Sequence, residues 1–500
     1  MGRGGGNDAD GAPIWNRWPR NTLDIPHFSH HEAHRNPQPR VSARLMKWNV
    51  AFPDGIPYTH TEAKTHSEKS HAMDCSKTAH KVREQLEGFL GIFSARFPKP
   101  TMRFIGQMVY GIQAAQDVKL SQIGRELCEP IPIGKVENRL SRNLAREGMA
   151  DVLHDCVLNH AAPGIGKDTL VVIDPSDIQK DYAKRMPYLA KVWDGSEGRL
   201  GDNLGYSGCM AIACEAGARK MVPLAFRLWS SEAPGFKSEN AEVEALVDAI
   251  AAKAGGNGIY VYDRGGDRIG LFNHFMDRRL RFIVRLVGTR NLVWRRKARL
   301  AGKIAAKCRM RHRTQVTFLS HGKECNVQIE FGAMDVELPA RPGEKLRLVV
   351  VRGFGNDPML LLTDLAATDS FKSLWQVVGG YVSRWRVEET IRYIKQSYRL
   401  EDMRLLNYER LKNMAALVLC ASAFAASWMG LGEKLEILVS HVLDMSKRIH
   451  RVPEFFYYAL ADGIRRLFSR YGNGWGRHMS DARRQTDDRQ LLLPLCFTPG

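Results

Sequence analysis

The chain has 500 residues, more than one hydrophobic core usually organises, so we expect two or more domains. Lysine and arginine number 73 against 54 aspartates and glutamates, and the resulting charge of +19 favours a polyanionic partner such as nucleic acid. The nine cysteines form no CxxC pair, which argues against a disulfide framework and favours a reduced, cytosolic protein.

Residues 1–45 are rich in glycine, proline, asparagine, arginine and histidine and show little apolar periodicity. This composition predicts a flexible basic arm. The opening stretch MGRGGGNDADGAP has no apolar segment of the kind found in signal peptides, so we do not expect export.

Residues 46–160 are predicted to form a helical, DNA-binding region. A helix over 117–127 precedes the turn CEPIPIG and a basic helix over 135–144, from which Arg139 and Arg142 can project outward. Helix, turn and basic helix fit a helix-turn-helix DNA reader. An ordinary helical hairpin fits equally well, because the turn is longer than usual.

Residues 161–288 alternate between strands and helices. Apolar, β-branched runs predict three strands, a helix, a fourth strand, a second helix and a fifth strand. This order predicts an α/β fold with a mixed sheet. Two of the strands run into acids: TLVVIDPSD (169–177) and GIYVYDRGGD (258–267).

Residues 289–365 are predicted to form a basic, β-rich insertion. The stretch 289–314 carries ten lysines and arginines and no acid, and four probable strands follow it. A run of this kind is often only a solvated face. The complete lack of carboxylates favours a phosphate-binding surface, with Arg295, Arg296 and Lys297 as candidate contacts.

Residues 366–405 contain the run YVSRWRVEETIRYIK, which reads as a helix. At about 100° per residue, Tyr381, Arg384, Glu388 and Lys395 share one narrow stripe with apolar neighbours on both sides. Such a stripe suits a site that binds metal and phosphate together. The alternative is an ordinary surface helix, since Arg384 and Glu388 have the spacing of a helical ion pair.

Residues 406–500 are predicted to be helical. The longest uncharged run, 413–432, is barely long enough to span a bilayer. Its Asn, Ser and Gly content and its basic flanks favour a buried core helix, so we expect no membrane association.

Three acids are the candidate chemical groups. Asp174 and Asp263 each follow a buried strand, where open sheets place their ligands, and the helix of 366–405 offers Glu388. Three converging carboxylates can hold two divalent cations for phosphoryl transfer, and Mg²⁺ (or Mn²⁺) suits such oxygen ligands. Asp177 and Asp267 are rival carboxylates, but residues further into a loop are aimed less predictably.

These features together resemble the DDE transposases of bacterial insertion sequences, specifically the IS-four-like group. The resemblance rests on DPSD after an apolar strand, the D-R-x-x-D form of YDRGGD, the β-rich insertion, and Y-x2-R-x3-E-x6-K at 381, 384, 388 and 395. It covers about residues 165–405. It implies a ribonuclease-H-like core, interrupted by the insertion, and cut-and-paste transposition by metal-dependent cleavage at transposon ends and strand transfer into target DNA.

The same resemblance implies roles for single residues. Asp174, Asp263 and Glu388 would be the catalytic, metal-binding triad. Other residues would contact DNA: Arg264 within D-R-x-x-D, Tyr381, Arg384 and Lys395 on phosphates, and Trp294 by stacking on a flipped base. A dimer would bridge the two terminal inverted repeats, and the enzyme would work on the nucleoid in the bacterial cytoplasm.

Two rival functions stay open at this stage. A ribonuclease-H-like nuclease that cuts without joining would use the same carboxylates and metals. A catalytically silent or repurposed sequence-specific DNA-binding protein would keep the basic surfaces alone. The arginine and lysine of the stripe favour an enzyme that retains DNA ends through several steps.

Overall fold

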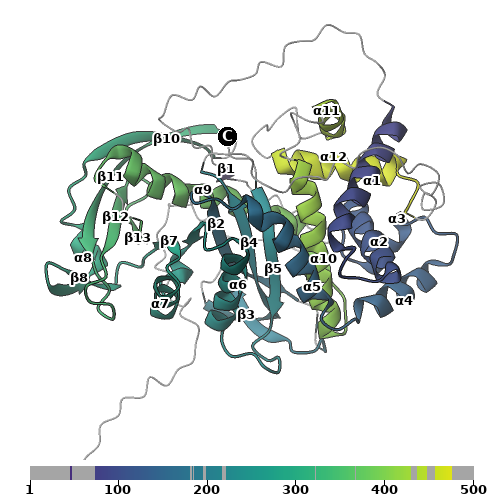
Figure 1. Cartoon of the computed structure of the whole chain (residues 1–500), viewed down its shortest axis with the longest axis horizontal. Coiled ribbons are helices and arrows are strands. Elements are labelled where there is room, and N and C mark those ends of the chain that lie inside the picture. Colours follow the sequence, from purple (N-terminus) through teal and green to yellow (C-terminus); the bar gives the residue numbers. More distant parts are fainter. Residues whose placement is uncertain are drawn as a thin grey trace, which may run out of the picture.

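The computed structural model describes residues 46–47, 74–180, 183, 185–194, 199–216, 221–320, 323–365, 368–428, 436–446 and 456–475. The arm predicted over residues 1–45 lies outside these ranges. The described part of the chain combines one mixed sheet of eleven strands with a helical region. Figure 1 shows the sheet reaching from one end of the molecule to its middle, with the N-terminal helices gathered at the opposite end.

The middle of the sheet follows the predicted order of strands and helices. Its elements are β2 (Leu170–Gln179), β4 (Arg199–Cys214), β5 (Met221–Trp229), α6 (Glu239–Lys253), β6 (Ile259–Tyr262), α7 (Ile269–Asp277) and β7 (Arg281–Arg285). The strands lie in the order β5–β4–β2–β6–β7, with β2, β6 and β7 parallel and β4 antiparallel to its neighbours. This is the mixed α/β, ribonuclease-H-like core expected from the sequence.

Apolar runs explain why these strands occupy the centre. Every residue of the run 170–173 in β2 and of β6 is buried. Parallel strands that are covered on both faces carry continuous apolar runs of this kind. In this part of the sheet, one strand was not predicted: β3 (Ala190–Asp194) pairs with the first half of β4.

Residues 289–365 continue the same sheet. The strands β10 (His312–Ser320), β11 (Lys323–Val336), β12 (Leu346–Arg352) and β13 (Met359–Thr363) pair in succession. β13 then pairs antiparallel with β7, which joins these strands to the core. Sequence reasoning predicted the strands but not this continuity, because the pairing of β13 with β7 has no local signal.

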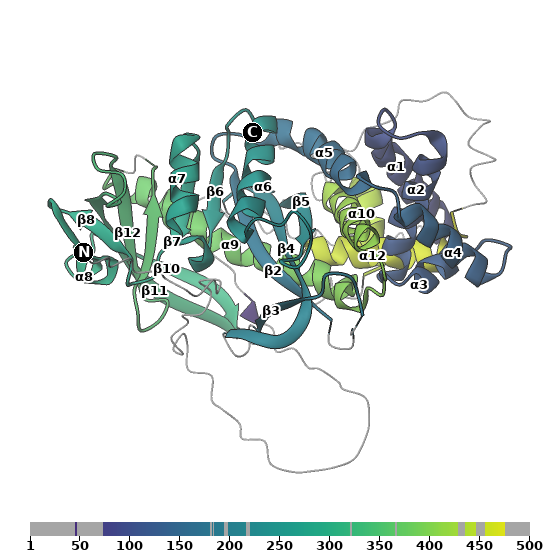
Figure 2. The ribbon, with the colours of Figure 1, turned by 90° about the horizontal axis from the view of Figure 1, so that it is seen from below.

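Short elements complete this end of the molecule. β1 (Met46–Lys47) pairs with β10. A separate hairpin is formed by β8 (Asn291–Trp294) and β9 (Lys297–Leu300), and α8 (Ala301–Ala305) follows it. Figure 2 shows the hairpin and α8 at the tip of the molecule, beyond the long strands.

One long helix, α9 (Phe371–Ser397), contacts strands of both the insertion and the core. Its N-cap is Ser370, whose Oγ accepts a hydrogen bond from the backbone N–H of Ser373 (3.3 Å). A Cβ placed on Gly380 would lie 3.2 Å from side-chain atoms of Leu170 in β2 and Ile283 in β7. The lack of a side chain at Gly380 therefore lets the middle of the helix approach the sheet closely.

The helical region packs around α10 (Tyr408–Ser427). Every residue of α10 from Asn413 onward is buried, which confirms the core helix predicted for the described part of the uncharged run. The other helices are α1 (Cys75–Leu90), α2 (Lys99–Ala115), α3 (Leu120–Glu126), α4 (Ile133–Leu144), α5 (Met149–Ala161), α11 (Glu436–Asp444) and α12 (Phe456–Tyr471). Among the described residues we find no helix with the length and apolarity needed to cross a bilayer.

Candidate active site

Asp174 and Asp263 come together because of the register between β2 and β6. These strands pair in parallel as far as Ile173 and Tyr262. The next residue on each strand is an aspartate, so the two carboxylates follow the paired segment at the same level. Asp263 Oδ1 accepts a hydrogen bond from the backbone N–H of Gly265 (2.8 Å), which starts the turn after β6.

The position of Asp174 differs from the expectation in one respect. The sequence placed Asp174 at the end of its own strand, whereas β2 continues to Gln179 because it pairs with β4 along its whole length. Asp174 therefore lies in the middle of β2, at the point where the neighbouring strand β6 ends. The site lies where the short strand β6 ends beside the longer strand β2.

The third carboxylate comes from α9, together with an arginine. Arg384 donates a short hydrogen bond to Glu388, four residues further along the helix. The Nη1 atom of Arg384 also lies 3.8 Å from Asp174 Oδ1. One guanidinium thus contacts a carboxylate of the helix and a carboxylate of the sheet. We call Asp174, Asp263 and Glu388 the carboxylate trio.

The carboxylates of the trio lie close enough to shift the pKa of Asp174. Burial raises the pKa of Asp174 to about 7, and the charges of Glu388 and Asp263 add to the rise while Arg384 and Lys395 oppose it. Burial acts to lower the pKa of Arg384, but the surrounding groups raise it overall, so the guanidinium stays charged. The negative charge of the trio is only partly neutralised by the protein.

The other residues of the predicted stripe lie on either side of Arg384. Tyr381 is fully buried, and its ring lies 5.2 Å from the guanidinium carbon of Arg384. Lys395 donates a hydrogen bond from Nζ to the backbone carbonyl of Asp177 (2.7 Å), which ties the last turns of α9 to β2. Arg264 follows Asp263 directly, and burial together with the charge of Arg285 lowers its pKa.

The rival carboxylates have other partners. Asp267 accepts hydrogen bonds from Arg290 Nε (2.5 Å) and from the backbone N–H of Val287 (2.7 Å), one on each carboxylate oxygen. Asp177 accepts a hydrogen bond from the Ser207 hydroxyl (3.2 Å). Asp267 thus serves the packing of the chain after β7, and its two oxygens are engaged away from the trio.

The donor atoms of the carboxylate trio decide which metal ion it could hold. Within the described residues, no three histidine, cysteine, aspartate or glutamate side chains are arranged so that they could hold a metal ion. The donor set itself fits a hard divalent cation, because three carboxylates supply oxygen ligands and excess negative charge. In this arrangement, however, the guanidinium of Arg384 takes one oxygen of Glu388.

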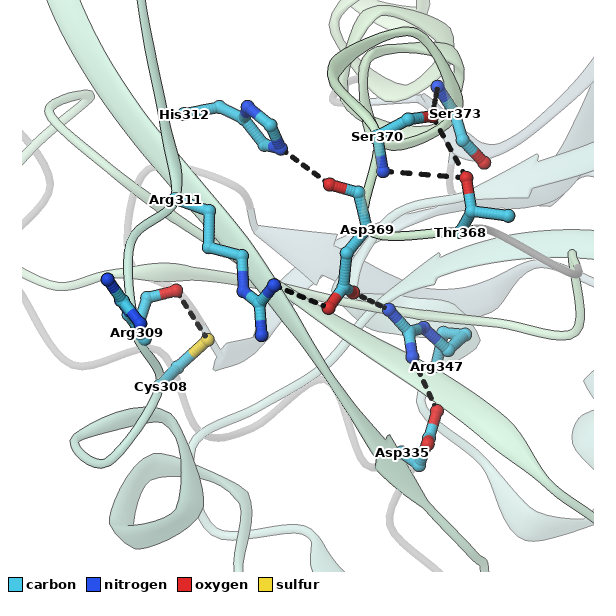
Figure 3. Close-up of polar contacts among 10 residues, drawn as sticks. All are labelled: Cys308, Arg309, Arg311, His312, Asp335, Arg347, Thr368, Asp369, Ser370 and Ser373. Carbon is cyan, nitrogen blue, oxygen red and sulfur yellow. Dashed lines mark hydrogen bonds and ion pairs between the residues drawn. The ribbon is translucent and has the colours of Figure 1, made fainter.

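A second ionic cluster holds the start of α9 (Figure 3). The Asp369 carboxylate pairs with Arg311 (3.2 Å) and with Arg347, and the Asp369 carbonyl accepts a hydrogen bond from His312 Nε2 (2.7 Å). Arg347 also pairs with Asp335. We call these five residues the Asp369 cluster. Sequence reasoning missed it because Asp369 lies 22 and 57 residues from its partners at 347 and 312.

The predicted DNA contacts of the insertion lie on the β8–β9 hairpin, away from the trio. Arg295, Arg296 and Lys297 are exposed at its turn, where the two arginines have φ of 50° and 62°. Left-handed backbone at both turn positions is usually supplied by glycine or asparagine. Trp294 is partly buried, and its ring lies 4.6 Å from the guanidinium carbon of Arg295 and 5.9 Å from Lys307 Nζ.

The predicted DNA contacts of the N-terminal region lie on α4. The predicted helix, turn and helix correspond to α3 and α4. Arg142 is exposed, whereas Arg139 makes two hydrogen bonds of 2.7 Å to the carboxylate of Glu129. Figures 1 and 2 place α4 and the β8–β9 hairpin at opposite ends of the molecule, so these two sets are not brought together.

A mixed sheet whose adjacent strands carry two aspartates, joined by a glutamate from a crossing helix, is a ribonuclease-H-like arrangement. The family model described as "Transposase DDE domain" matches residues 165–424. This chain belongs to that family. Members of the family are transposases, which makes DNA transposition the class of its activity.

Two further comparisons complete these findings. Among solved structures, the chain is similar to the piggyBac transposase synaptic complex with hairpin DNA, with a TM-score of 0.36 and 11% sequence identity. The similarity covers 85% of this chain and 86% of that one. No curated protein matches the sequence.

Proposed function

We propose that the protein is a cut-and-paste transposase of the IS-four-like group. It would cleave DNA at the ends of its insertion sequence and join those ends to target DNA. The observation that carries this proposal is the meeting of Asp174, Asp263 and Glu388 from two adjacent strands and one helix. The Y-R-E-K spacing supports the group, and the arginine of this spacing lies near both Asp174 and Glu388.

In this proposal the carboxylate trio is catalytic and holds two Mg²⁺ or Mn²⁺ ions. When bound, such ions activate the attacking oxygen and stabilise the leaving one during phosphoryl transfer. The protein contributes fixed positions for its ligands: Asp174 by strand pairing, Asp263 by its turn, and Glu388 by the contact of α9 with the sheet at Gly380. Ligands held in fixed positions favour the in-line alignment of the attacking and leaving oxygens.

Several basic surfaces support DNA as the partner. Tyr381, Arg384, Lys395 and Arg264 surround the trio and would hold the phosphates next to the cut. The turn of the β8–β9 hairpin presents Arg295, Arg296 and Lys297 beside Trp294, and its left-handed arginines are the kind of backbone outlier that marks functional sites. An aromatic ring beside these cations suits stacking on an extruded base.

We further propose that residues 46–160 read the terminal inverted repeats, with Arg139 and Arg142 of α4 among the contacts. Arg139 would first have to leave Glu129, so Arg142 is the more direct candidate. A homodimer would bridge two transposon ends, acting on nucleoid DNA in the bacterial cytoplasm. Residues 161–288 and 366–405 would form the catalytic core around the insertion.

The experiment that tests this function is cleavage and joining of a DNA that carries the element's own ends. It compares Mg²⁺ or Mn²⁺ with EDTA, and the wild type with Asp174→Ala. We expect metal-dependent excision and strand transfer that the substitution removes. Cleavage without joining would support a nuclease instead, and end binding without any cleavage would support a repurposed DNA-binding protein.

A further inference from the structure

Arg384 is buried next to carboxylates, which is unusual for a residue that is expected to bind DNA phosphates. Its side chain is 6% exposed, it donates to Glu388, and its Nη1 lies 3.8 Å from Asp174. Asp263 is a third neighbour whose charge acts on it. The guanidinium therefore lies among the three carboxylates that the proposed function assigns to metal ions.

Three carboxylates crowd around one guanidinium. Two further cations act on single members of the trio: Lys395, which is bonded to a backbone carbonyl, acts on Asp174, and Arg264 acts on Asp263. Arg384 is the cation that pairs with both the helix carboxylate and the sheet carboxylate Asp174. Carboxylates held this close to one another favour a cation between them.

Arg384 and a divalent cation compete for the same oxygen atoms. The Glu388 oxygen that would ligate a metal accepts the hydrogen bond from Arg384. A guanidinium and a divalent cation at neighbouring positions also repel one another. This oxygen of Glu388 can therefore bind a metal only after Arg384 has withdrawn from it.

Arg384 has bonding capacity left for another anion. Its Nε is buried without a hydrogen-bond partner among the described residues, and the same is true of the Tyr381 hydroxyl beneath it. A phosphate offers the paired oxygens that a guanidinium fork accepts best. Glu388 is 35% exposed, so the site is open at its side.

We propose that Arg384 is the resident counter-cation of the carboxylate trio and is exchanged for divalent metal when a DNA phosphate takes up its guanidinium. This inference rests on the proposed function. Without DNA, Arg384 neutralises part of the trio and weakens metal binding. With DNA, the arginine moves to the phosphate and the oxygens of Glu388 and Asp174 become available. Metal loading is thereby coupled to the arrival of the substrate.

The test is the affinity of the full chain for Mn²⁺ without DNA, measured by the electron paramagnetic resonance signal of free Mn²⁺. Arg384→Gln should bind Mn²⁺ at least about tenfold more tightly than the wild type, the scale of one nearby charge in a partly buried site. Equal affinities would overturn the proposal.

Lys395→Gln is the matched control. It also removes one positive charge that acts on Asp174, but Lys395 does not contact the trio. A general electrostatic effect would raise the Mn²⁺ affinity equally in both variants. The exchange predicts a clearly larger gain for Arg384→Gln, and equal gains would contradict it.

A second measurement uses the wild type and does not depend on the folding of a variant. The Mn²⁺ affinity should rise when a duplex carrying the element's end is added, and the same addition should change little in Arg384→Gln. An unchanged wild-type affinity would overturn the exchange. A protein that cuts its ends with no such rise would remain a transposase, so the failure of this inference is distinguishable from failure of the proposed function.

Discussion

The two ionic clusters along α9 differ in their charge balance. At the start of the helix, the Asp369 cluster sets two carboxylates against two arginines, and its partners all come from the insertion (Figure 3). Near the middle, the carboxylate trio sets three carboxylates against Arg384 and the more distant Lys395. The charges of the first cluster balance, whereas in the second three carboxylates crowd around one guanidinium.

In our proposal, this difference separates a cluster that holds the fold together from a cluster that binds metal ions. A neutral cluster can hold two segments together without any ligand. Crowded, buried carboxylates lower stability and persist at sites where function requires them, which is why groups with perturbed pKa values concentrate there. The same helix thus carries balanced charges at its start and the crowded carboxylates of the proposed active site near its middle.

The largest expected effect is on cleavage. Glu388→Gln should lower the rate of end cleavage by about a thousandfold or more, because it removes a charged member of a group that acts as a unit. Binding of the ends should stay within a few fold. Single-turnover cleavage and gel-shift titrations measure the two quantities.

Asp369→Asn is the comparison for this result. It removes one carboxylate from the neutral cluster on the same helix and should retain most of the cleavage rate. A rate as low as that of Glu388→Gln would give both clusters the same role. Normal cutting by Glu388→Gln would remove that residue from the site.

The next effect is on stability as a function of pH, measured by urea unfolding in EDTA. The pKa of Asp174 is raised to about 7 in the folded protein, above its usual value of 3.8. The folded state therefore keeps a proton that the unfolded state releases, and stability falls as the pH rises toward and through 7. Asp174→Asn should exceed the wild type by about 4 kcal/mol at pH 8 and by less at pH 5. If the stabilities of the two proteins changed with pH in parallel, the raised pKa of Asp174 would be contradicted.

A third effect, on DNA binding, compares the basic residues at the turn of the β8–β9 hairpin with an arginine that is already ion-paired. Replacing Arg295, Arg296 and Lys297 with alanine should weaken DNA binding and reduce the slope of log affinity against log salt by up to about 3, if each contacts one phosphate. Arg347→Ala should leave the slope unchanged, because Arg347 is already paired with Asp335 and Asp369. Similar slopes for the two variants would make the hairpin an ordinary surface.

The smallest effect is on the Asp369 cluster itself. Asp369→Asn should lower the free energy of unfolding by about 1 kcal/mol, because the carboxylate is partly exposed and pairs with two arginines. Asp335→Asn, at a more exposed carboxylate with one arginine partner, should cost about half of that or less. The reverse order would show that Asp369 is not the centre of the cluster.

Local patterns predicted the core of the fold and the members of the trio. The apolar runs before Asp174 and Asp263 predict buried strands, and the spacing from Tyr381 to Lys395 predicts one face of one helix. These signals are local because burial and helical periodicity act on neighbouring residues. The roles of these residues remain proposals that the experiments above test.

The remaining features depend on partners that are distant in the sequence. Pairing with β4 carries β2 beyond Asp174, and Glu129 engages the arginine that was expected to face DNA from α4. The Asp369 cluster joins Arg311, which precedes β10, and charges from β11 and β12 to the start of α9. No spacing rule connects such residues, because their proximity is set by the register of strands.

The pairing of β13 with β7 joins the insertion and the core in one sheet, so we expect the two to unfold together. Removing residues 289–365 would leave β7 as an open sheet edge, with unpaired backbone groups that invite aggregation. The insertion and the core should therefore lose their amide hydrogen-exchange protection in one cooperative step rather than in two. A variant of this chain with a shortened insertion would have to keep β13, since that strand is what closes the edge.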